Sequence, residues 1–361
     1  MLLQWGTWLN TNVKRATIIA PMRDPATETN RRSNNFGALR LLFAVLVILS
    51  HSPELVDGNR SREILTRIFG TLSFGEVGVD GFFLISGYLI AKSFQDSRSA
   101  KEYVIKRVLR IYPGYVVAYL LCIFALGPFV GGQITELSGV QVLKEIVTLH
   151  DPSMPGVFAG TPYPVLDGSM WTIAYEFRCY LLVLGAGLVA PLAGRQVLPL
   201  LAMAALTISA IHPNPSIRLA GIFACGALYY VYRDRIWYNW SISLMAAVGL
   251  ITLMFSARLA EAALAALGGY LLFWFAFNVN SPTLAKIGRT TDLSYGVYLY
   301  AWPVQKLLIW CNPNISPWLV FFGTTAIAGL LALGSWHLVE KPFLRLKPGT
   351  VRDKVDVPIR V

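Results

Sequence analysis

The sequence predicts an all-α, polytopic membrane protein with about ten transmembrane helices. Charged residues make up only 14% of the 361-residue chain, whereas a soluble domain of ordinary composition carries about a quarter. Hydrophobic residues make up 55%, the mean hydropathy is +0.53, and the apolar residues gather in long runs. A helix of about twenty apolar residues crosses a bilayer core about 30 Å thick. These observations argue against an ordinary soluble domain.

Ten apolar runs of this kind follow one another along the chain, and each is predicted to form a helix. They occupy residues 36–52, 76–95, 110–130, 170–193, 196–212, 216–232, 237–256, 259–278, 291–311 and 316–338. Pro213 and Pro215 separate the fifth run from the sixth, so a shorter pair or a re-entrant turn is the alternative there. The longest loop, residues 131–169, is predicted to face outside. It has a Pro- and Gly-rich end and is expected to form an ordered lid or rim rather than a domain.

The distribution of basic residues predicts the orientation of these helices. With the amino terminus inside, 23 of the 31 Lys and Arg residues lie in inside segments, six lie outside and two lie within runs. Because positive residues accumulate on the cytoplasmic side, both termini are predicted to be cytoplasmic. Residues 1–35 and 343–361 are then cytoplasmic tails around a membrane domain at 36–342, with no cleaved signal peptide. The net charge of +11 reflects this topology, and no nucleic-acid-binding motif accompanies it.

Two polar residues of the first run are costly to place in lipid. Arg40 lies near the start of the run, and His51 follows eleven residues later. At about 1.5 Å per residue, His51 lies about 16 Å deeper, roughly halfway through the hydrocarbon core. Titratable residues at such a depth usually line a polar cavity and act there. A hydrogen-bonded contact between helices is the structural alternative for His51.

Asp80 and Glu176 are the candidate partners of His51. Asp80 lies near the outer start of the second run, and Glu176 lies in the fourth run, about 9 Å below the outer surface. All three side chains therefore fall in the outer half of the membrane, where a carboxylate can fix the imidazole tautomer of a general base. A helix cap or a basic partner is the alternative for Asp80. Arg178 and Lys306 are candidate partners for either carboxylate or for a substrate.

A second group of polar residues lies on the predicted cytoplasmic side. Arg107 and Arg110 are three residues apart, so they share one face of a helix. Two guanidiniums on one face suit the phosphates of a nucleotide-like ligand, whereas contact with anionic lipid head groups is the alternative. Arg40 lies on the same side, which favours convergence of the three arginines on one anion. The four cysteines show no metal-ligand spacing, and no metal site is predicted.

Six short motifs follow one another from residue 36 to about residue 343. They are Arg40 with His51; Gly78-Val79-Asp80 followed by Phe82-Phe83 and Ser86-Gly87-Tyr88-Leu89-Ile90; Arg107 and Arg110 followed by Tyr112-Pro113; Trp171-Thr172-Ile173 with Glu176; Ser294-Tyr295 with Tyr298-Leu299 and Trp302-Pro303; and Val339-Glu340-Lys341-Pro342. In this order they resemble the membrane acyltransferase-3 family, bacterial integral-membrane carbohydrate O-acyltransferases.

Two positions depart from the pattern of that family. Thr172 and Ile173 stand where many members have Ser and Leu, and Thr172 keeps the hydroxyl. Ala301 stands where many members carry a His before the Trp-Pro pair, which leaves His51 as the main imidazole candidate. The chain matches the transmembrane module alone, without the hydrolase-like domain of some longer members.

The resemblance implies an O-acyltransferase of the bacterial inner membrane, surrounded by membrane lipids. Its donor is expected to be cytoplasmic acyl-CoA, most commonly acetyl-CoA, bound as a co-substrate by Arg40, Arg107 and Arg110, with no permanently bound cofactor. Its acceptor is expected to be a carbohydrate at the outer face. His51 is then the general base or a transient acyl carrier, oriented by Glu176 or Asp80. The residues expected to line the acceptor cavity are Ser86, Trp171, Tyr175, Arg178 and Lys306.

A transporter or flippase, which moves a carbohydrate or an acyl group without covalent chemistry, is the alternative from another class. Ten helices with charged residues at mid-depth fit it equally, but the sequence shows no inverted repeat and no paired broken helices. An inactive scaffold is a third hypothesis, against which the retained Arg40, His51 and Glu176 argue. The acyl group, whether acetyl, succinyl or another, stays open. The acceptor, whether exopolysaccharide, lipopolysaccharide O-antigen, lipo-oligosaccharide or antibiotic sugar, also stays open.

Overall fold

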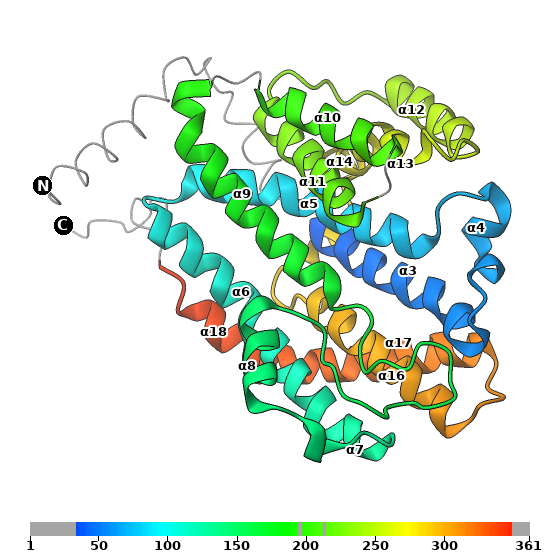
Figure 1. The fold of residues 1–361 in the computed structure, drawn as a ribbon. Helices are drawn as coiled ribbons and strands as arrows, with labels where there is room; N and C mark the ends of the chain where they lie inside the picture. The colour runs from blue at the N-terminus through cyan, green and yellow to red at the C-terminus, as the bar shows by residue number, and fades with distance from the viewer. Residues whose placement is uncertain (1–33, 194–196, 212–213, 349–361) are drawn as a thin grey trace, which may run out of the picture.

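The computed structural model describes residues 34–193, 197–211 and 214–348, and within these ranges it is built from helices with no β-strand (Figure 1). The all-α prediction is therefore confirmed for the described chain. The predicted tails, residues 1–35 and 343–361, lie mostly outside these ranges.

Long helices alternate with short helical turns along the chain. The α-helices are α3 (Phe36–Asp57), α4 (Ile64–Phe69), α5 (Phe74–Asp96), α6 (Ala100–Leu121), α7 (Gly127–Phe129), α8 (Gly139–Thr148), α9 (Trp171–Ala193), α10 (Val197–Ile211), α11 (Pro215–Val231), α12 (Trp240–Leu253), α13 (Ala260–Ala263), α14 (Gly269–Asn278), α15 (Pro282–Lys286), α16 (Ser294–Cys311), α17 (Pro317–Ser335) and α18 (Lys341–Arg345). Short 3-10 turns lie at Arg60–Arg62 and Ile134–Glu136, and π-helical turns at Cys122–Leu126, Leu264–Gly268 and Trp336–Glu340.

Five helical stretches are long and apolar enough to cross a membrane, judged by length and composition. They are Phe36–Asp57, Phe74–Asp96, Ala100–Phe129, Ala260–Asn278 and Pro317–Arg345. Three further helices, Pro199–Ser209, Pro215–Val231 and Trp240–Leu253, are apolar but shorter. A helix covers most of each of the ten predicted runs. These features fit a multi-pass membrane protein, while the number of about ten spans and the cytoplasmic side of the termini stay predictions.

Local sequence signals set several helix ends. Helix α5 begins after Ser73, whose hydroxyl oxygen accepts from the Glu76 N–H while the Glu76 carboxylate accepts from the Ser73 N–H. This reciprocal capping box satisfies two backbone donors. Gly58 ends α3 in the left-handed region at φ 76°. The predicted break between the fifth and sixth runs is a helix boundary, because α10 ends at Ile211 and α11 begins at Pro215.

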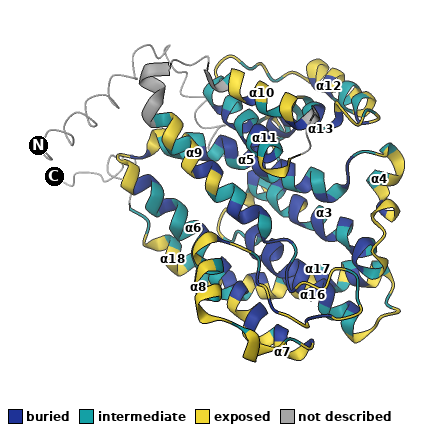
Figure 2. Ribbon diagram, in the orientation of Figure 1, coloured by how far each residue is buried: buried dark blue, intermediate teal, exposed yellow. Residues whose placement is uncertain are grey.

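Helix α3 lies at the centre of the packing that carries the site. It contacts α5, α16 and α17, and α5 in turn packs along α11 (Figure 1). Helices α5 and α11 approach closely at two glycines. A Cβ on Gly87 would lie 2.0 Å from the Phe223 carbonyl oxygen, and one on Gly226 would lie 2.1 Å from the Leu84 carbonyl oxygen. Figure 2 shows the buried centre, with exposed residues along α4, α7, α8 and α12 at the periphery.

The predicted loop at residues 131–169 is ordered, and it contains a helix, α8, that sequence analysis did not predict. After α8, residues 149–170 run as irregular chain to α9. We call them the outer segment, after the side of the membrane on which the sequence predicts them. Six buried apolar side chains anchor the segment, those of Leu149, Met154, Val157, Phe158, Leu166 and Met170. The hydroxyl of Tyr298 on α16 also donates a 2.7 Å hydrogen bond to its Ser169 carbonyl oxygen. The outer segment is therefore fixed against α16.

Candidate active site

His51 lies on α3 and faces a carboxylate of the same helix. Its Nδ1 is 3.0 Å from Oε2 of Glu54, three residues along, so the two side chains share one helix face. From the outer segment, the Tyr163 hydroxyl donates a 3.0 Å hydrogen bond to Glu54 Oε1. No described residue hydrogen-bonds to Nε2, and 26% of the His51 side chain is exposed. A carboxylate at Nδ1 and an open Nε2 are the arrangement of a general base.

Helix α16 forms the opposite wall around the imidazole. The ring of Trp302 packs edge-on against His51, with centroids 5.0 Å apart and planes at 71°. Gln305 donates hydrogen bonds to the Ile48 carbonyl oxygen at 2.9 Å and to the Ser52 hydroxyl at 3.0 Å. Because Ile48 and Ser52 flank His51 on α3, these bonds fix α16 against this part of the helix.

The two carboxylates predicted to orient His51 have other partners. Both carboxylate oxygens of the buried Asp80 lie within 3.0 Å of Nη1 of Arg218, so its basic partner is on α11. Glu176 Oε1 accepts from the Ser86 hydroxyl at 2.5 Å and from the Tyr180 hydroxyl at 2.7 Å. The predicted pairing with His51 is therefore replaced by Glu54. Matching depth in the membrane does not fix the direction in which a side chain points around its helix.

Arg40 and Arg110 converge, as predicted, but on a carboxylate of the protein itself. Nη1 of Arg40 and Nη2 of Arg110 each lie 2.7 Å from Oδ2 of Asp292, just before α16. The Ser294 hydroxyl donates a 2.6 Å hydrogen bond to Oδ1. Burial alone would raise the pKa of the Asp292 carboxyl, but the two arginines and Ser294 hold that pKa well below its ordinary value. These ion pairs of Arg40 and Arg110 with Asp292, which we call the arginine knot, join α3, α6 and the start of α16.

Arg107 lies beside the knot and has different contacts. Its Nη2 donates to the Ser93 hydroxyl at 3.1 Å, and its guanidinium lies over the rings of Tyr103 and Tyr180 at 5.9 and 5.8 Å. Its Nε is buried and has no hydrogen-bond partner among the described residues. Arg107 therefore keeps an unused donor.

Lys347 adds a further basic group to this end of the molecule. Burial, followed by the charges of Arg110, Arg107, Lys106 and Arg40, lowers the pKa of Lys347 to about 7. The arginines that were predicted to bind phosphates therefore lie in a strongly positive region, only part of which Asp292 neutralises. This electrostatic setting suits a ligand that carries several negative charges.

The residues predicted to line an acceptor cavity fall into separate groups. Ser86 contacts Glu176, as described above. Trp171 and Tyr175 stack edge to face on α9, and Arg178 lies over the Tyr175 ring at 5.1 Å as an exposed side chain rather than an interior one. Lys306 is buried on α16 and reaches the outer segment, where its Nζ lies 2.7 Å from the Thr161 hydroxyl. No described contact joins Trp171, Tyr175 or Arg178 to His51.

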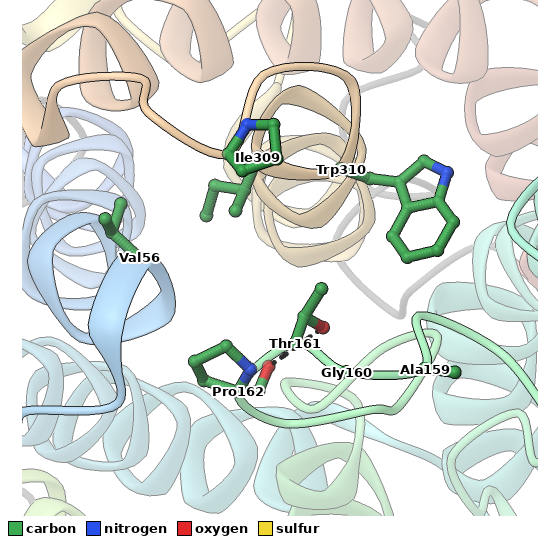
Figure 3. A pocket seen from close by; sticks show the side chains of 8 residues that line it. Val56, Ala159, Gly160, Thr161, Pro162, Ile309 and Trp310 are labelled. Atoms are coloured by element: carbon green, nitrogen blue, oxygen red, sulfur yellow. Dashed lines mark hydrogen bonds between the residues drawn. The ribbon is translucent and has the colours of Figure 1, made fainter.

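An open cavity of about 450 Å³ lies between the ends of α3 and α16 and the outer segment (Figure 3). Its walls are Val56 from α3, residues 159–162 from the outer segment, Ile309 and Trp310 from α16, and Pro313 beyond it. The cavity and the His51 site draw on the same segments, because Val56 follows Glu54 by two residues on α3 and Pro162 precedes Tyr163. As for metals, the described chain brings no three His, Cys, Asp or Glu side chains together in a way that would hold one.

Sequence analysis did not single out three residues that shape these sites. Glu54 was detectable, since a Glu three residues after a buried His lies on the same helix face. Asp292 stands two residues before the Ser294-Tyr295 motif, but no local pattern connects it with arginines of two distant helices. Lys347 lies beyond the last motif, and only tertiary packing brings it near Arg110.

Comparison with known proteins places this geometry in a family. The family model described as an acyltransferase domain, of the acyltransferase-3 type, matches residues 34–337. The chain is 29% identical to an O-acetyl transferase of Shigella phage Sf6, over 87% of this chain and 96% of that protein. It is 28% identical to nodulation protein 10 of Rhizobium leguminosarum bv. viciae, over 90% of this chain and 96% of that protein. A shorter similarity, 26% identity over 38% of this chain and 35% of the relative, joins it to acyltransferase MdmB of Streptomyces mycarofaciens.

No solved structure matches the chain. The family match covers the helices that carry His51, the arginine knot and Glu176, and it extends over well more than half of the sequence. Taken with the long apolar helices, it shows that the chain is a multi-pass membrane acyltransferase and belongs to the acyltransferase-3 family.

Proposed function

We propose that the protein transfers an acyl group, most simply acetyl, from cytoplasmic acyl-CoA to a hydroxyl group of a cell-surface or exported carbohydrate, and that it resides in a bacterial inner membrane. One observation carries the proposal. Nδ1 of His51 is hydrogen-bonded to Glu54, and Nε2 has no partner among the described residues. His51 also lies on the same helix as Arg40, one of the two arginines paired with Asp292. The O-acetyl transferase among the relatives is consistent with this chemistry.

The chemical step follows from the held imidazole. As the acceptor oxygen attacks the thioester carbonyl carbon, its proton passes to Nε2 of His51. The tetrahedral intermediate collapses by breaking the carbon–sulfur bond, and the CoA thiolate takes the proton from Nε2. Glu54 keeps the other proton on Nδ1 and stabilises the transient imidazolium. The ester product and free CoA therefore form with no net change in the protein. A transient acyl-imidazole is the variant in which Nε2 attacks the thioester first.

We propose that the phosphates of the acyl-CoA donor bind the basic cluster, which is formed by Arg40, Arg107, Arg110 and Lys347. These four residues lie together, and the buried Nε of Arg107 has no partner in the described chain and is proposed to donate to a phosphate oxygen. The Nη1 atom of Arg110 also lies 3.5 Å from a carboxylate oxygen of Glu340. Asp292 takes one N–H group from each of Arg40 and Arg110, so a phosphate either shares these arginines with it or displaces it. Acyl-CoA is thus a co-substrate and no resident cofactor is proposed. Asp80 and Glu176 are proposed to act from the surrounding network rather than on the imidazole.

The test is acyl transfer in sealed membrane vesicles whose cytoplasmic face is outside. Labelled acetyl-CoA is supplied to native protein, His51→Ala and the matched control His150→Ala, whose imidazole is exposed in the outer segment. We expect label in carbohydrate with native protein and His150→Ala, and none with His51→Ala at equal membrane content. Normal transfer by His51→Ala would contradict the proposed mechanism. Carbohydrate movement without stoichiometric release of CoA would favour the flippase alternative.

A further inference from the structure

The cavity in Figure 3 is lined by segments that also build the proposed catalytic site, yet the mechanism above gives it no occupant. Its volume, about 450 Å³, lies within the range of small-molecule sites. Two of its three walls come from segments that also build the His51 site: α3 carries His51, Glu54 and Val56, and the outer segment carries Tyr163 directly after Pro162. The third wall comes from α16, which also carries Trp302 against the imidazole.

The lining has an uncommon combination of apolar surface and free backbone groups. None of the eight lining residues carries a charge, and Thr161 supplies the only polar side chain among them. Gly160 has a φ of 80°, and a Cβ there would meet no atom within 4 Å, so its backbone opens on free space. Within the described chain, the N–H groups of Ala159 and Gly160 donate no hydrogen bond. Unpaired donors beside an indole ring suit a ligand with both a hydrocarbon face and hydroxyl groups.

The buried ammonium group of Lys306 already contacts two residues that line the cavity. Nζ of Lys306 contacts the Thr161 hydroxyl oxygen at 2.7 Å and the Pro162 carbonyl oxygen at 2.5 Å, and it lies 4.9 Å from the centre of the Phe158 ring. It therefore holds residues 161–162 in place and does not line the cavity. A carboxylate or phosphate entering here would find no charged partner among the lining residues, so the lining offers it no compensation for any hydration that it loses.

We propose that this cavity is the acceptor subsite of the enzyme and that it takes an uncharged sugar residue, with the ring packed on Trp310 and its hydroxyls on the backbone of residues 159–160. This inference rests on the proposed function, because it requires a hydroxyl acceptor. It adds what that function leaves open, namely where the acceptor binds and that the acylated sugar is neutral.

The first experiment compares Trp310→Ala, Trp310→Phe and the control Trp318→Ala in the vesicle assay. Trp318 is 57% exposed on α17 and does not line the cavity. We expect Trp310→Ala to lower transfer to carbohydrate roughly tenfold or more through loss of acceptor binding, Trp310→Phe to restore most of it, and Trp318→Ala to behave as native. Native transfer rates in Trp310→Ala would overturn the assignment.

The second experiment reads the charge of the acceptor. Mass spectrometry of the labelled product places the acyl group on a particular sugar. An acyl group on a hexose or deoxyhexose without an acidic substituent supports the proposal, and one on a uronic acid or phosphorylated sugar overturns it. Absence of both transfer and CoA release with native protein would instead remove the proposed function, and the acceptor assignment with it.

A third measurement follows occupancy without catalysis. Cys311 is a free, exposed thiol that follows the lining residue Trp310 at the end of α16, so protection of it from a membrane-impermeant maleimide is expected when a ligand covers this end of the helix. Oligosaccharide released from the surface glycan of the host strain is the probe. We expect it to slow alkylation in native protein and in His51→Ala alike, and to have no effect in Trp310→Ala. An unchanged rate in both native protein and His51→Ala would overturn the proposal even if transfer occurs.

Discussion

His51 and Glu54 form a unit because they are three residues apart on one continuous helix. A carboxylate at this spacing reaches the imidazole without any tertiary contact. Tyr163 then fixes the second oxygen of Glu54, and Trp302 limits the rotation of the ring. The result is an imidazole whose Nδ1 proton is held and whose Nε2 is left for substrate.

Glu54→Gln tests the pairing of Glu54 with His51 by replacing one carboxylate oxygen with an amide nitrogen. The amide keeps the size of the side chain but lacks the negative charge, and its NH₂ group can donate to Nδ1 and stabilise the wrong tautomer. We expect acyl transfer to fall roughly 10²-fold or more, with little change in the KM for acyl-CoA. Tyr163→Phe, which removes one hydrogen bond to the same carboxylate, is expected to cost far less. Steady-state assays in vesicles measure both, and near-native turnover in Glu54→Gln would refute the positioning role.

Single residues also show where sequence analysis reaches its limit. The spacing of Arg40 and His51 along one helix could be used because it depends on local geometry alone. The partners of Asp80 and Glu176 depend on how α5, α9 and α11 are rotated about their axes. The sequence of one chain gives depth but not rotation, so these pairings could not be predicted.

Between elements, the closest approach is that of α5 and α11 at Gly87 and Gly226. Backbone carbonyl oxygens occupy the space where side chains would lie, and backbone cannot move aside as a flexible side chain does. Small residues at helix crossings in membranes allow this contact. The crossing also places the buried Asp80 of α5 against Arg218 of α11.

Gly87→Ala should therefore separate the two helices. A methyl group there would lie 2.0 Å from the Phe223 carbonyl oxygen, and we expect a loss of about 1–3 kcal/mol or more in stability. The measurement is the Tm of detergent-solubilised protein, which should fall by several degrees. Gly185→Ala on α9 is the matched control, because its methyl group would meet no atom within 4 Å. Equal Tm values for the two variants would show that α5 and α11 are not in close contact.

Helix positions were the most predictable part of the fold. Long apolar runs and the Pro213–Pro215 break mark where helices lie, since both are properties of the local chain. Helix α8 was missed because it is short and lies in a polar loop, and the π-helical turns were missed because one extra residue per turn leaves no clear mark on composition.

For the whole molecule, the outer segment joins helices that are far apart in sequence, and it contains one buried acid, Asp167, and one partly buried acid, Asp151. Burial raises the pKa of Asp167 to about 8 despite hydrogen bonds from Ser169, and burial and Glu145 raise the pKa of Asp151 to about 7. Oδ2 of Asp167 is buried without a hydrogen-bond partner in the described chain. Near neutral pH, Asp167 is therefore largely protonated in the folded segment.

The segment should loosen as the pH rises. The unfolded chain loses the Asp167 proton near pH 4, whereas the folded chain keeps it to about 8, so the contribution of Asp167 to stability is fully present below about pH 4 and falls between these values. Hydrogen exchange of residues 149–170, corrected for intrinsic rates, should be roughly tenfold or more faster at about pH 8.5 than at about pH 5.5. Asp167→Asn should reduce this dependence. An identical pH response in Asp167→Asn would mean that another group controls it.

The placement of two polar groups on one helix has a consequence for substrate choice. Arg40 and His51 both lie on α3, eleven residues apart, which corresponds to about 16 Å along a regular helix axis. Under the proposed function, the helix therefore selects donors by the distance between their phosphates and their acyl carbon. An acyl phosphate is too short to reach both ends, whereas a donor with a pantetheine-length arm between its phosphates and its thioester engages both at once. The distance between charge and acyl carbon, more than the acyl group itself, is what such a helix selects.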